Sequence, residues 1–400
     1  MIAPNIHNRF SRALPALLVA AAVTATPPLT VGELAHKLVA PVHSPYQPTV
    51  AVLAGLSPYC TLALRMPVGP PPAILSVVVV GPAARTASAR NNSGTTVDTC
   101  SLNPPRVPPA KGTILLLPGY GMPKAALLPY STALAAKGYR AVLVDLRAQG
   151  ESTGAHLGYG KQEARDLVQV LHYLRQHGFL AGKVGLLGIS YGAAVALDTA
   201  AVDDQIRAVV AVAPFARVDP TIRRFLDMSD PQLAATISPR LLRQAIKRAG
   251  RLVGYPLTEA DPLRAVSAIR APVLYLAGAK DPVAPLRDVQ VLAAKTPHSQ
   301  IIIEAQKNHL TLTSDVPLIV KSAILWFERY LKTSSDRASL PGNQRDTAPE
   351  RRIDRTAIRQ RRKGLTSDGE MSSNRAVILS AHPRTAKHWN RRFRHERTGQ

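Results

Sequence analysis

The chain has 400 residues, enough for two average domains or for one α/β domain with extensions. Hydrophobic residues make up 46% and aromatic residues only 5%, so the core must consist mainly of Ala, Val, Leu and Ile. The net charge of +24 is diffuse: residues 333–400 contribute +9 (16 Lys/Arg, 7 Asp/Glu), and no Lys/Arg run longer than two occurs elsewhere. Because diffuse charge specifies no partner, we expect no specific nucleic-acid binding.

The first 25 residues have the pattern of a secretory signal peptide. Arg9 and Arg12 precede an apolar stretch at 13–23, and residues 23–25 offer a signal peptidase the small residues that it accepts. The apolar stretch is shorter than the roughly 20 residues of a membrane-spanning helix. We therefore expect cleavage after Ala25 and a periplasmic or secreted protein. An uncleaved membrane anchor and a disordered terminus are the alternatives.

Cys60 and Cys100 are the only cysteines. If the chain is exported, an oxidising compartment permits a disulfide between them, and closing this loop would stabilise the fold by roughly 4 kcal/mol. In the cytosol they would be two thiols. The sequence has no CxxC or HExxH motif, and two cysteines cannot hold a structural zinc unaided. We therefore expect no metal and no cofactor.

Residues 26–110 contain three apolar, β-branched runs between proline-rich breaks. The runs at 49–53, 61–65 and 73–80 predict antiparallel strands at the edge of a sheet. Residues 84–105 are rich in Ser, Thr, Asn and Pro, and predict a surface loop.

Residues 111–332 alternate between buried strands and amphipathic helices. We predict strands over 113–117, 141–145, 184–187, 208–213, 273–277 and 300–304, and helices over 124–137, 162–177, 193–201 and 314–331. This alternation is typical of an α/β domain with a mostly parallel sheet covered by helices on both faces. In such sheets ligands bind at the carboxyl ends of the strands, so we expect function in the loops there.

A Gly-x-Ser-x-Gly pentapeptide stands at 188–192, with Ser190 at its centre. Ordinary residue usage would produce this pattern by chance in about one chain of this length in ten. Here it lies between a predicted strand and a predicted helix, where a nucleophilic serine needs small neighbours to fit a sharp turn. The pattern therefore predicts Ser190 as a nucleophile; the alternative is an inert serine in a glycine-rich turn.

A serine nucleophile requires a base and an orienting carboxylate, expected in this order after later strands. Asp281 follows the strand predicted over 273–277, and His309 follows the strand over 300–304 in a loop 28 residues further on. The competitor His298 precedes its strand and would lie at the wrong edge of the sheet. We therefore predict the catalytic set Ser190, Asp281 and His309. For the oxyanion hole we predict the main-chain N–H groups of Tyr191, which follows the nucleophile, and Tyr120.

Residues 111–332 resemble the bacterial α/β-hydrolases of the serine aminopeptidase-like, dienelactone-hydrolase-like and prolyl-oligopeptidase-like groups. The matching stretches are Leu117-Pro-Gly-Tyr-Gly121, Asp145-Leu-Arg-Ala-Gln-Gly-Glu-Ser152, Gly188-Ile-Ser-Tyr-Gly192, Ala271-Pro-Val-Leu274 with Asp281-Pro282, and Asn308-His309. Ala148 replaces a usual glycine, and Pro118 stands where the oxyanion loop usually has the His of a His-Gly pair. The resemblance implies an α/β-hydrolase fold and places the same triad on Ser190, Asp281 and His309.

Residues 216–263 leave the sheet pattern and predict a small helical lid. Ser238-Pro239 begins a marked helix that Gly250 ends, and its cations Arg240, Arg243, Lys247 and Arg251 share one face. That face could meet an acidic substrate or an anionic membrane surface; the alternative is a solvated face. Residues 333–400 have few aliphatic residues and many arginines, which predicts a disordered tail.

These patterns favour hydrolysis of a small-molecule ester through an acyl-enzyme. An exopeptidase acting on a short peptide with the same triad is the second hypothesis. A non-catalytic binding protein that keeps the fold is the third, although the retained Ser, Asp and His argue against it. The sequence does not specify the oligomeric state.

Overall fold

The computed structural model describes residues 29–43, 59–84, 89–90, 96–97, 109–331 and 377–381. The predicted signal peptide, the apolar run at 49–53, Cys100 and most of the segment 333–400 lie outside the described residues. Across the part of the chain that is described, no helix has the length and apolar character to cross a membrane.

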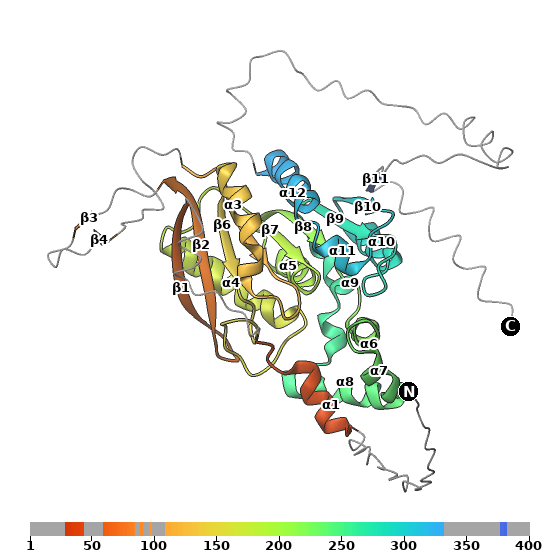
Figure 1. The fold of residues 1–400 in the computed structure, drawn as a ribbon. Helices are drawn as coiled ribbons and strands as arrows, with labels where there is room; N and C mark the ends of the chain where they lie inside the picture. The colour runs from red at the N-terminus through yellow and green to blue at the C-terminus, as the bar shows by residue number, and fades with distance from the viewer. Residues whose placement is uncertain are drawn as a thin grey trace, which may run out of the picture.

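The described strands form one nine-stranded sheet and a separate two-stranded pair (Figure 1). The large sheet has the order β1-β2-β6-β5-β7-β8-β9-β10-β11. Its members are β1 (Tyr59–Val68), β2 (Ala73–Ala84), β5 (Gly112–Leu117), β6 (Arg140–Val144), β7 (Lys183–Ile189), β8 (Ile206–Val212), β9 (Val273–Gly278), β10 (Ser299–Glu304) and β11 (Val377–Ala381). The small pair is β3 (Ala89–Arg90) with β4 (Thr96–Val97). From β6 to β10 all neighbours are parallel, as the sequence predicts.

Helices cover both faces of the large sheet because its central strands bury side chains on both sides. In β5, Leu115 and Leu117 join one core cluster, whereas Ile114 and Leu116 join the other. The first cluster includes α4 (Lys161–Gln176), α5 (Tyr191–Val202) and α10 (Leu286–Lys295); the second includes α3 (Leu128–Ala136), which the short helix η1 (Lys124–Leu127) precedes, and α12 (Val316–Tyr330). The fold class predicted from sequence is therefore confirmed, and helix α10 and strand β10 lie between Asp281 and His309.

The amino-terminal strands lie at one edge of this sheet. β1 pairs antiparallel with β2, and β2 pairs antiparallel with β6, so the two runs predicted at 61–65 and 73–80 form antiparallel strands at this edge of the sheet, with β1 outermost. Cys60 on β1 is buried and disulfide-bonded.

One helix precedes these strands and was not predicted: α1 (Val31–Val39). The Thr30 side chain accepts from the Glu33 N–H, and the Glu33 carboxylate accepts from the Thr30 N–H at 2.8 Å, which completes a capping box. α1 packs along a helix of the lid, α8 (Pro239–Val253), and the two lie side by side in Figure 1.

The lid lies between β8 and β9 and is helical, as predicted. It consists of α6 (Val218–Ser229), α7 (Pro231–Thr236) and α8, followed by η2 (Leu257–Ala260), α9 (Pro262–Ala265) and η3 (Val266–Ala268). Ser238 caps α8 by accepting from the Leu241 N–H, as predicted. Gly250 lies inside α8 rather than ending it, and Gly254, four residues later, ends the helix in the left-handed conformation.

The far edge of the sheet corrects one expectation. Val377–Ala381, inside the segment predicted to be disordered, forms β11 and pairs antiparallel with β10. Val377 and Ile378 are β-branched residues with high β propensity, and β10 offers an open strand edge to pair with. The prediction of disorder is therefore wrong for these five residues.

Candidate active site

The turn between β7 and α5 holds Ser190 in a strained conformation. Its φ of 52° and ψ of −109° are unfavourable for a residue with a side chain. A Cβ on Gly188 would lie 2.1 Å from the carbonyl oxygen of Gly192, and one on Gly192 would lie 2.2 Å from that of Leu117. Both glycines of the pentapeptide are thus required sterically, and the strand-turn-helix setting predicted for Ser190 is present.

Three side chains from separate strand ends form a chain of hydrogen bonds. Ser190 Oγ lies 2.9 Å from His309 Nε2, and His309 Nδ1 lies 2.8 Å from Asp281 Oδ2. A carboxylate only accepts, so Nδ1 carries the proton of the neutral ring and Nε2 is left to accept from the serine hydroxyl. The arrangement can therefore remove the proton from Ser190 when the hydroxyl attacks an electrophile.

The Asp281 carboxylate is held in place by its own loop. Its second oxygen, Oδ1, accepts from the main-chain N–H groups of Val283 and Ala284, each at 2.8 Å. Asp281 and His309 are each 5% exposed, so their mutual bond is shielded from solvent. Both carboxylate oxygens are therefore occupied, which fixes the orientation of the imidazole ring.

His309 differs from the prediction in its local structure. It begins the short helix α11 (His309–Thr313) instead of lying in an irregular loop. Asn308 caps this helix: its side chain accepts from the Thr311 N–H, and the Thr311 hydroxyl accepts from the Asn308 N–H, both at 2.9 Å. The capped turn fixes the backbone from which the imidazole projects.

The loop after β5 lies beside the nucleophile. A Cβ on Gly119 would be 3.8 Å from the Ser190 Cβ. The rings of Tyr120 and Tyr191 are 6.3 Å apart, so the structure brings together the two residues predicted for the oxyanion hole. Their main-chain N–H groups belong to a tight turn and to the first turn of α5, where N–H groups have no partner within the helix.

Gln149 braces this loop, a role that the sequence did not reveal. Its fully buried side chain accepts from the Gly121 N–H at 2.7 Å. Gln149 lies in the stretch 145–152, next to Ala148, which has a φ of 58°. The glycine that is usual at position 148 would relieve this conformation. With Pro118 in the position of the usual histidine, the Gln149 amide from the neighbouring loop holds this turn.

Buried charges fix the loop that carries Gln149. Asp145 accepts from the main-chain N–H and the Nζ of Lys124, at 2.6 and 2.7 Å. Arg147 forms a bidentate pair with Asp166 on α4, with bonds of 2.7 and 2.8 Å. Both pairs are almost fully shielded from solvent. The charged residues of the stretch 145–152 therefore serve to hold the loop rather than to react.

The lid contacts the site through α6. The Phe225 ring packs edge-on against the Tyr120 ring, with centroids 5.2 Å apart. The neighbouring Arg224 forms a 2.7 Å ion pair with Asp288 on α10 and donates to the carbonyl of Val283 at 3.3 Å. Because the Val283 N–H holds Asp281, Arg224 ties the lid to the loop of the predicted orienting carboxylate.

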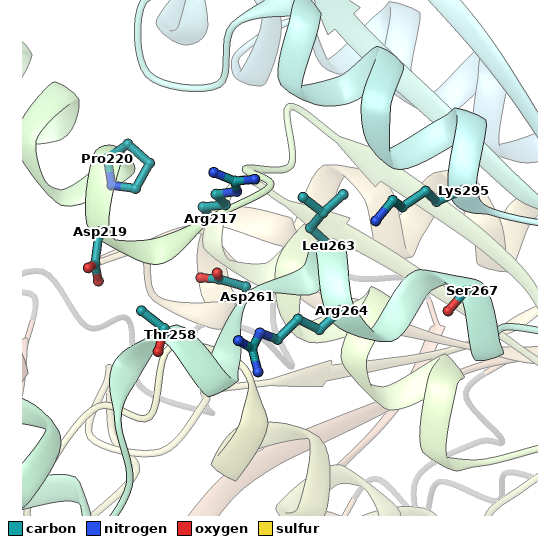
Figure 2. A pocket seen from close by; sticks show the side chains of 9 residues that line it. All are labelled: Arg217, Asp219, Pro220, Thr258, Asp261, Leu263, Arg264, Ser267 and Lys295. Carbon is teal, nitrogen blue, oxygen red and sulfur yellow. The ribbon is translucent and has the colours of Figure 1, made fainter. Parts of the chain in front are cut away.

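A hollow of about 1060 Å³ lies between the lid base and α10 (Figure 2). It is lined by Arg217, Asp219, Pro220, Thr258, Asp261, Leu263, Arg264, Ser267 and Lys295. Figure 2 shows charged side chains of both signs around it. Since Ser190, Asp281 and His309 do not line it, we do not assign the reaction to this hollow.

The geometry can be compared with known proteins. The sequence profile of the alpha/beta hydrolase family matches residues 114–322, more than half of the chain. The chain belongs to this family. It is thus a hydrolase, and the resemblance inferred from its motifs is confirmed.

Among solved structures, this α/β hydrolase is similar to two crystal forms of the Pyrococcus furiosus esterase Pf2001. The TM-scores are 0.52 and 0.53 at 19% and 20% identity, over 74% and 73% of this chain and 98% and 100% of the other. A 2,6-dihydroxy-pseudo-oxynicotine hydrolase gives a TM-score of 0.47 at 16% identity, over 68% of this chain and 69% of the other. The likeness to the Pyrococcus furiosus esterase shows the fold. No curated protein matches the sequence.

Proposed function

We propose that this α/β hydrolase cleaves carboxylic esters through an acyl-enzyme on Ser190. The observation that carries the proposal is the hydrogen-bonded series from Ser190 Oγ to His309 and on to Asp281, built on a strained turn at a helix N-terminus. A hydroxyl in this setting is activated by the base beside it. The similarity in fold to the Pyrococcus furiosus esterase supports an ester as the substrate class.

The reaction follows from the positions of these groups. His309 Nε2 takes the proton as Ser190 Oγ attacks the ester carbonyl, and Asp281 stabilises the imidazolium that forms. The carbonyl oxygen becomes an oxyanion that the N–H groups of Tyr120 and Tyr191 stabilise. His309 then protonates the departing alcohol, which leaves an acyl group on Ser190. Water, deprotonated by the same imidazole, releases the carboxylic acid and restores the enzyme.

A fluorophosphonate probe tests the nucleophile directly. We expect one covalent adduct on Ser190 of the folded protein and none on Ser190→Ala. An unlabelled wild-type protein, or equal labelling of Ser190→Ala, would contradict the proposal. The variants Ser190→Ala and His309→Ala should keep the fold, judged by circular dichroism, and lose all but a few per cent of turnover.

The substrate class needs a separate comparison, because an exopeptidase would use the same three residues. Turnover of p-nitrophenyl esters should exceed turnover of aminoacyl-anilides at equal concentrations. Faster cleavage of the anilides would instead favour the peptidase. A series of acyl-chain lengths then measures the size of the acyl group that the site accepts.

We also propose that the protein is exported. The signal-like pattern of residues 1–25 supports this location, and so does the disulfide bond of Cys60, because disulfides persist in oxidising compartments. Mass spectrometry of the protein from the exported fraction should find the mature N-terminus at Thr26. An intact Met1 on exported protein would argue for an uncleaved anchor.

A further inference from the structure

Tyr191 has a buried side chain whose role the proposed reaction does not explain. It follows the nucleophile directly, yet its phenol points away from solvent and the residue is only 3% exposed. The phenol oxygen accepts from the Tyr159 N–H at 2.8 Å and donates to Glu163 Oε1 at 2.7 Å. The residue whose main-chain N–H faces the reaction is therefore anchored at the opposite end, inside the protein.

Glu163 is the group that receives this anchor. It lies in the first turn of α4 and is fully buried. Its Oε1 also accepts from the Gly158 N–H at 2.6 Å, and its Oε2 accepts from the Gly160 N–H at 2.9 Å. The nearest lysine along the chain, Lys161, forms its ion pair with Glu259. Glu163 is thus held by neutral donors.

The three bonds define the charge state of Glu163. Both glycine N–H groups can only donate, and the Tyr191 phenol already accepts from Tyr159, so its proton is directed at Glu163. A proton on the carboxyl would have no acceptor among these three partners, and the arrangement therefore fits the carboxylate. The pKa of Glu163 is raised, chiefly by burial, and the hydrogen bonds from Gly158, Tyr191 and Gly160 offset part of that rise.

A second buried acid lies next to this site. Asp198 on α5 is 7% exposed, and its Oδ2 would lie 2.3 Å from a Cβ on Gly160. Burial raises the pKa of Asp198 well above its usual value, and the charge on Glu163 raises it further. Burial beside Glu163 thus disfavours the charged form of Asp198, whereas the three donors to Glu163 favour the carboxylate that accepts from the Tyr191 phenol.

We propose that Glu163 is a positioning residue for the oxyanion hole and acts through the Tyr191 phenol on the Tyr191 main-chain N–H. This inference rests on the proposed ester hydrolysis. An oxyanion donor must be fixed to within about 0.5 Å by supporting contacts to stabilise the transition state. The Ser190 backbone is strained, so the peptide that follows it needs such a contact.

A purely structural role makes a different prediction. If the Glu163–Tyr191 bond only stabilises the fold, removing it lowers the melting temperature and leaves the kinetics of the folded enzyme unchanged. If it positions the donor, kcat falls while KM stays the same, because the lost interaction exists only in the transition state. Affinity for an analogue that forms an oxyanion should fall by the same factor.

The variant Tyr191→Phe distinguishes the structural role of the Glu163–Tyr191 bond from the positioning role, and Tyr275→Phe is its control. Tyr275 is also fully buried, and its phenol bonds to the Thr296 hydroxyl at 2.7 Å, away from the nucleophile. Each variant is assayed with a p-nitrophenyl ester well below its melting temperature. The dissociation constant of a trifluoromethyl ketone, which adds to Ser190 as a hemiketal oxyanion, is measured alongside.

We expect Tyr191→Phe to lower kcat roughly tenfold with KM unchanged within twofold. The dissociation constant of the trifluoromethyl ketone should rise roughly tenfold. Tyr275→Phe should keep the wild-type kcat, KM and dissociation constant of the trifluoromethyl ketone. The inference is overturned if Tyr191→Phe resembles Tyr275→Phe, if its loss is in KM, or if kcat falls without the matching loss of inhibitor affinity. Failure of the proposed function would look different, because wild-type protein would then show no Ser190 adduct and no turnover.

Glu163→Gln supplies a second test where it folds. Its amide keeps one acceptor oxygen but removes the charge and presents an NH₂ group to donors. We expect the same pattern of lower kcat at constant KM, and addition of Tyr191→Phe should lower kcat no further. If the two substitutions lower kcat independently, so that their factors multiply in the double variant, Glu163 does not act through the Tyr191 phenol and the inference is overturned.

Discussion

The strain at Ser190 can be measured by removing the side chain in two ways. Ser190→Ala and Ser190→Gly both lose the bond to His309, so that contribution cancels when the two are compared. Alanine keeps a Cβ at φ 52° and ψ −109°, where the cost is about 1–3 kcal/mol, and glycine does not. Glycine in turn lowers the free energy of unfolding by about 0.5–1 kcal/mol, because the unfolded chain with glycine is more flexible. The glycine variant should thus be more stable by about 1 kcal/mol.

Thermal unfolding of the two inactive variants is the assay. For a domain of about 200 residues, a difference of 1 kcal/mol corresponds to roughly 2–4 °C in melting temperature. Ser322 provides the control, since it is a serine with little exposure that lies inside α12 with ordinary helical geometry, whereas Ser190 is partly exposed on its strained turn. There the order should reverse, with glycine less stable than alanine by about 1 kcal/mol. A Ser190→Gly protein that melts at or below Ser190→Ala would refute the assignment of strain to this turn.

Three further predictions concern residues around the site. Asp281→Asn should lower kcat about 10⁴-fold in the ester assay while circular dichroism stays native, and a loss below tenfold would contradict its orienting role. Gln149→Met removes the acceptor for the Gly121 N–H and should lower kcat roughly tenfold at constant KM; unchanged kcat would exclude the brace. Asp198 has a raised pKa when folded, so its contribution to stability is present at low pH and is lost as pH rises above the unfolded value of about 3.9. Asp198→Asn should therefore raise the urea midpoint at pH 7 and leave it unchanged near pH 3; an equal gain at both values would refute this titration.

The sequence was most informative where local sterics decide the structure. Apolar runs bounded by Gly and Pro indicate the buried strands. At positions 188 and 192 glycine is required, because a Cβ added there would lie under 2.5 Å from a backbone atom. Asp281 and His309 could be predicted because each follows such a run. The positions of all three residues at the same sheet edge then follow from the parallel order of β7, β9 and β10.

The features that could not be predicted depend on side chains meeting across loops. Gln149 reaches Gly121 across 28 residues and Glu163 reaches Tyr191 across the same span, with no periodic pattern to indicate either bond. Two helices that we did not predict, α1 and α11, do have a local signal in the sequence. The sequence Thr30-Val-Gly-Glu33 is a capping box for α1, whose buried residues Leu34, Ala35, Leu38 and Val39 follow the helical period. Asn308 precedes α11 as a cap, but α11 has only five residues and is too short to show a periodic apolar stripe.

Both halves of the proposed oxyanion hole are braced by one segment of the chain, residues 149–163. Its first residue, Gln149, holds the loop of Tyr120, and its last residue, Glu163, holds Tyr191. Arg147, just before this segment, is clamped to Asp166, just after it, so the segment is closed by a buried ion pair. Breaking that pair would leave a buried charge unpaired and loosen both braces together. The geometry of the two donors is therefore coupled through this one loop, although they lie on opposite sides of the nucleophile in the sequence.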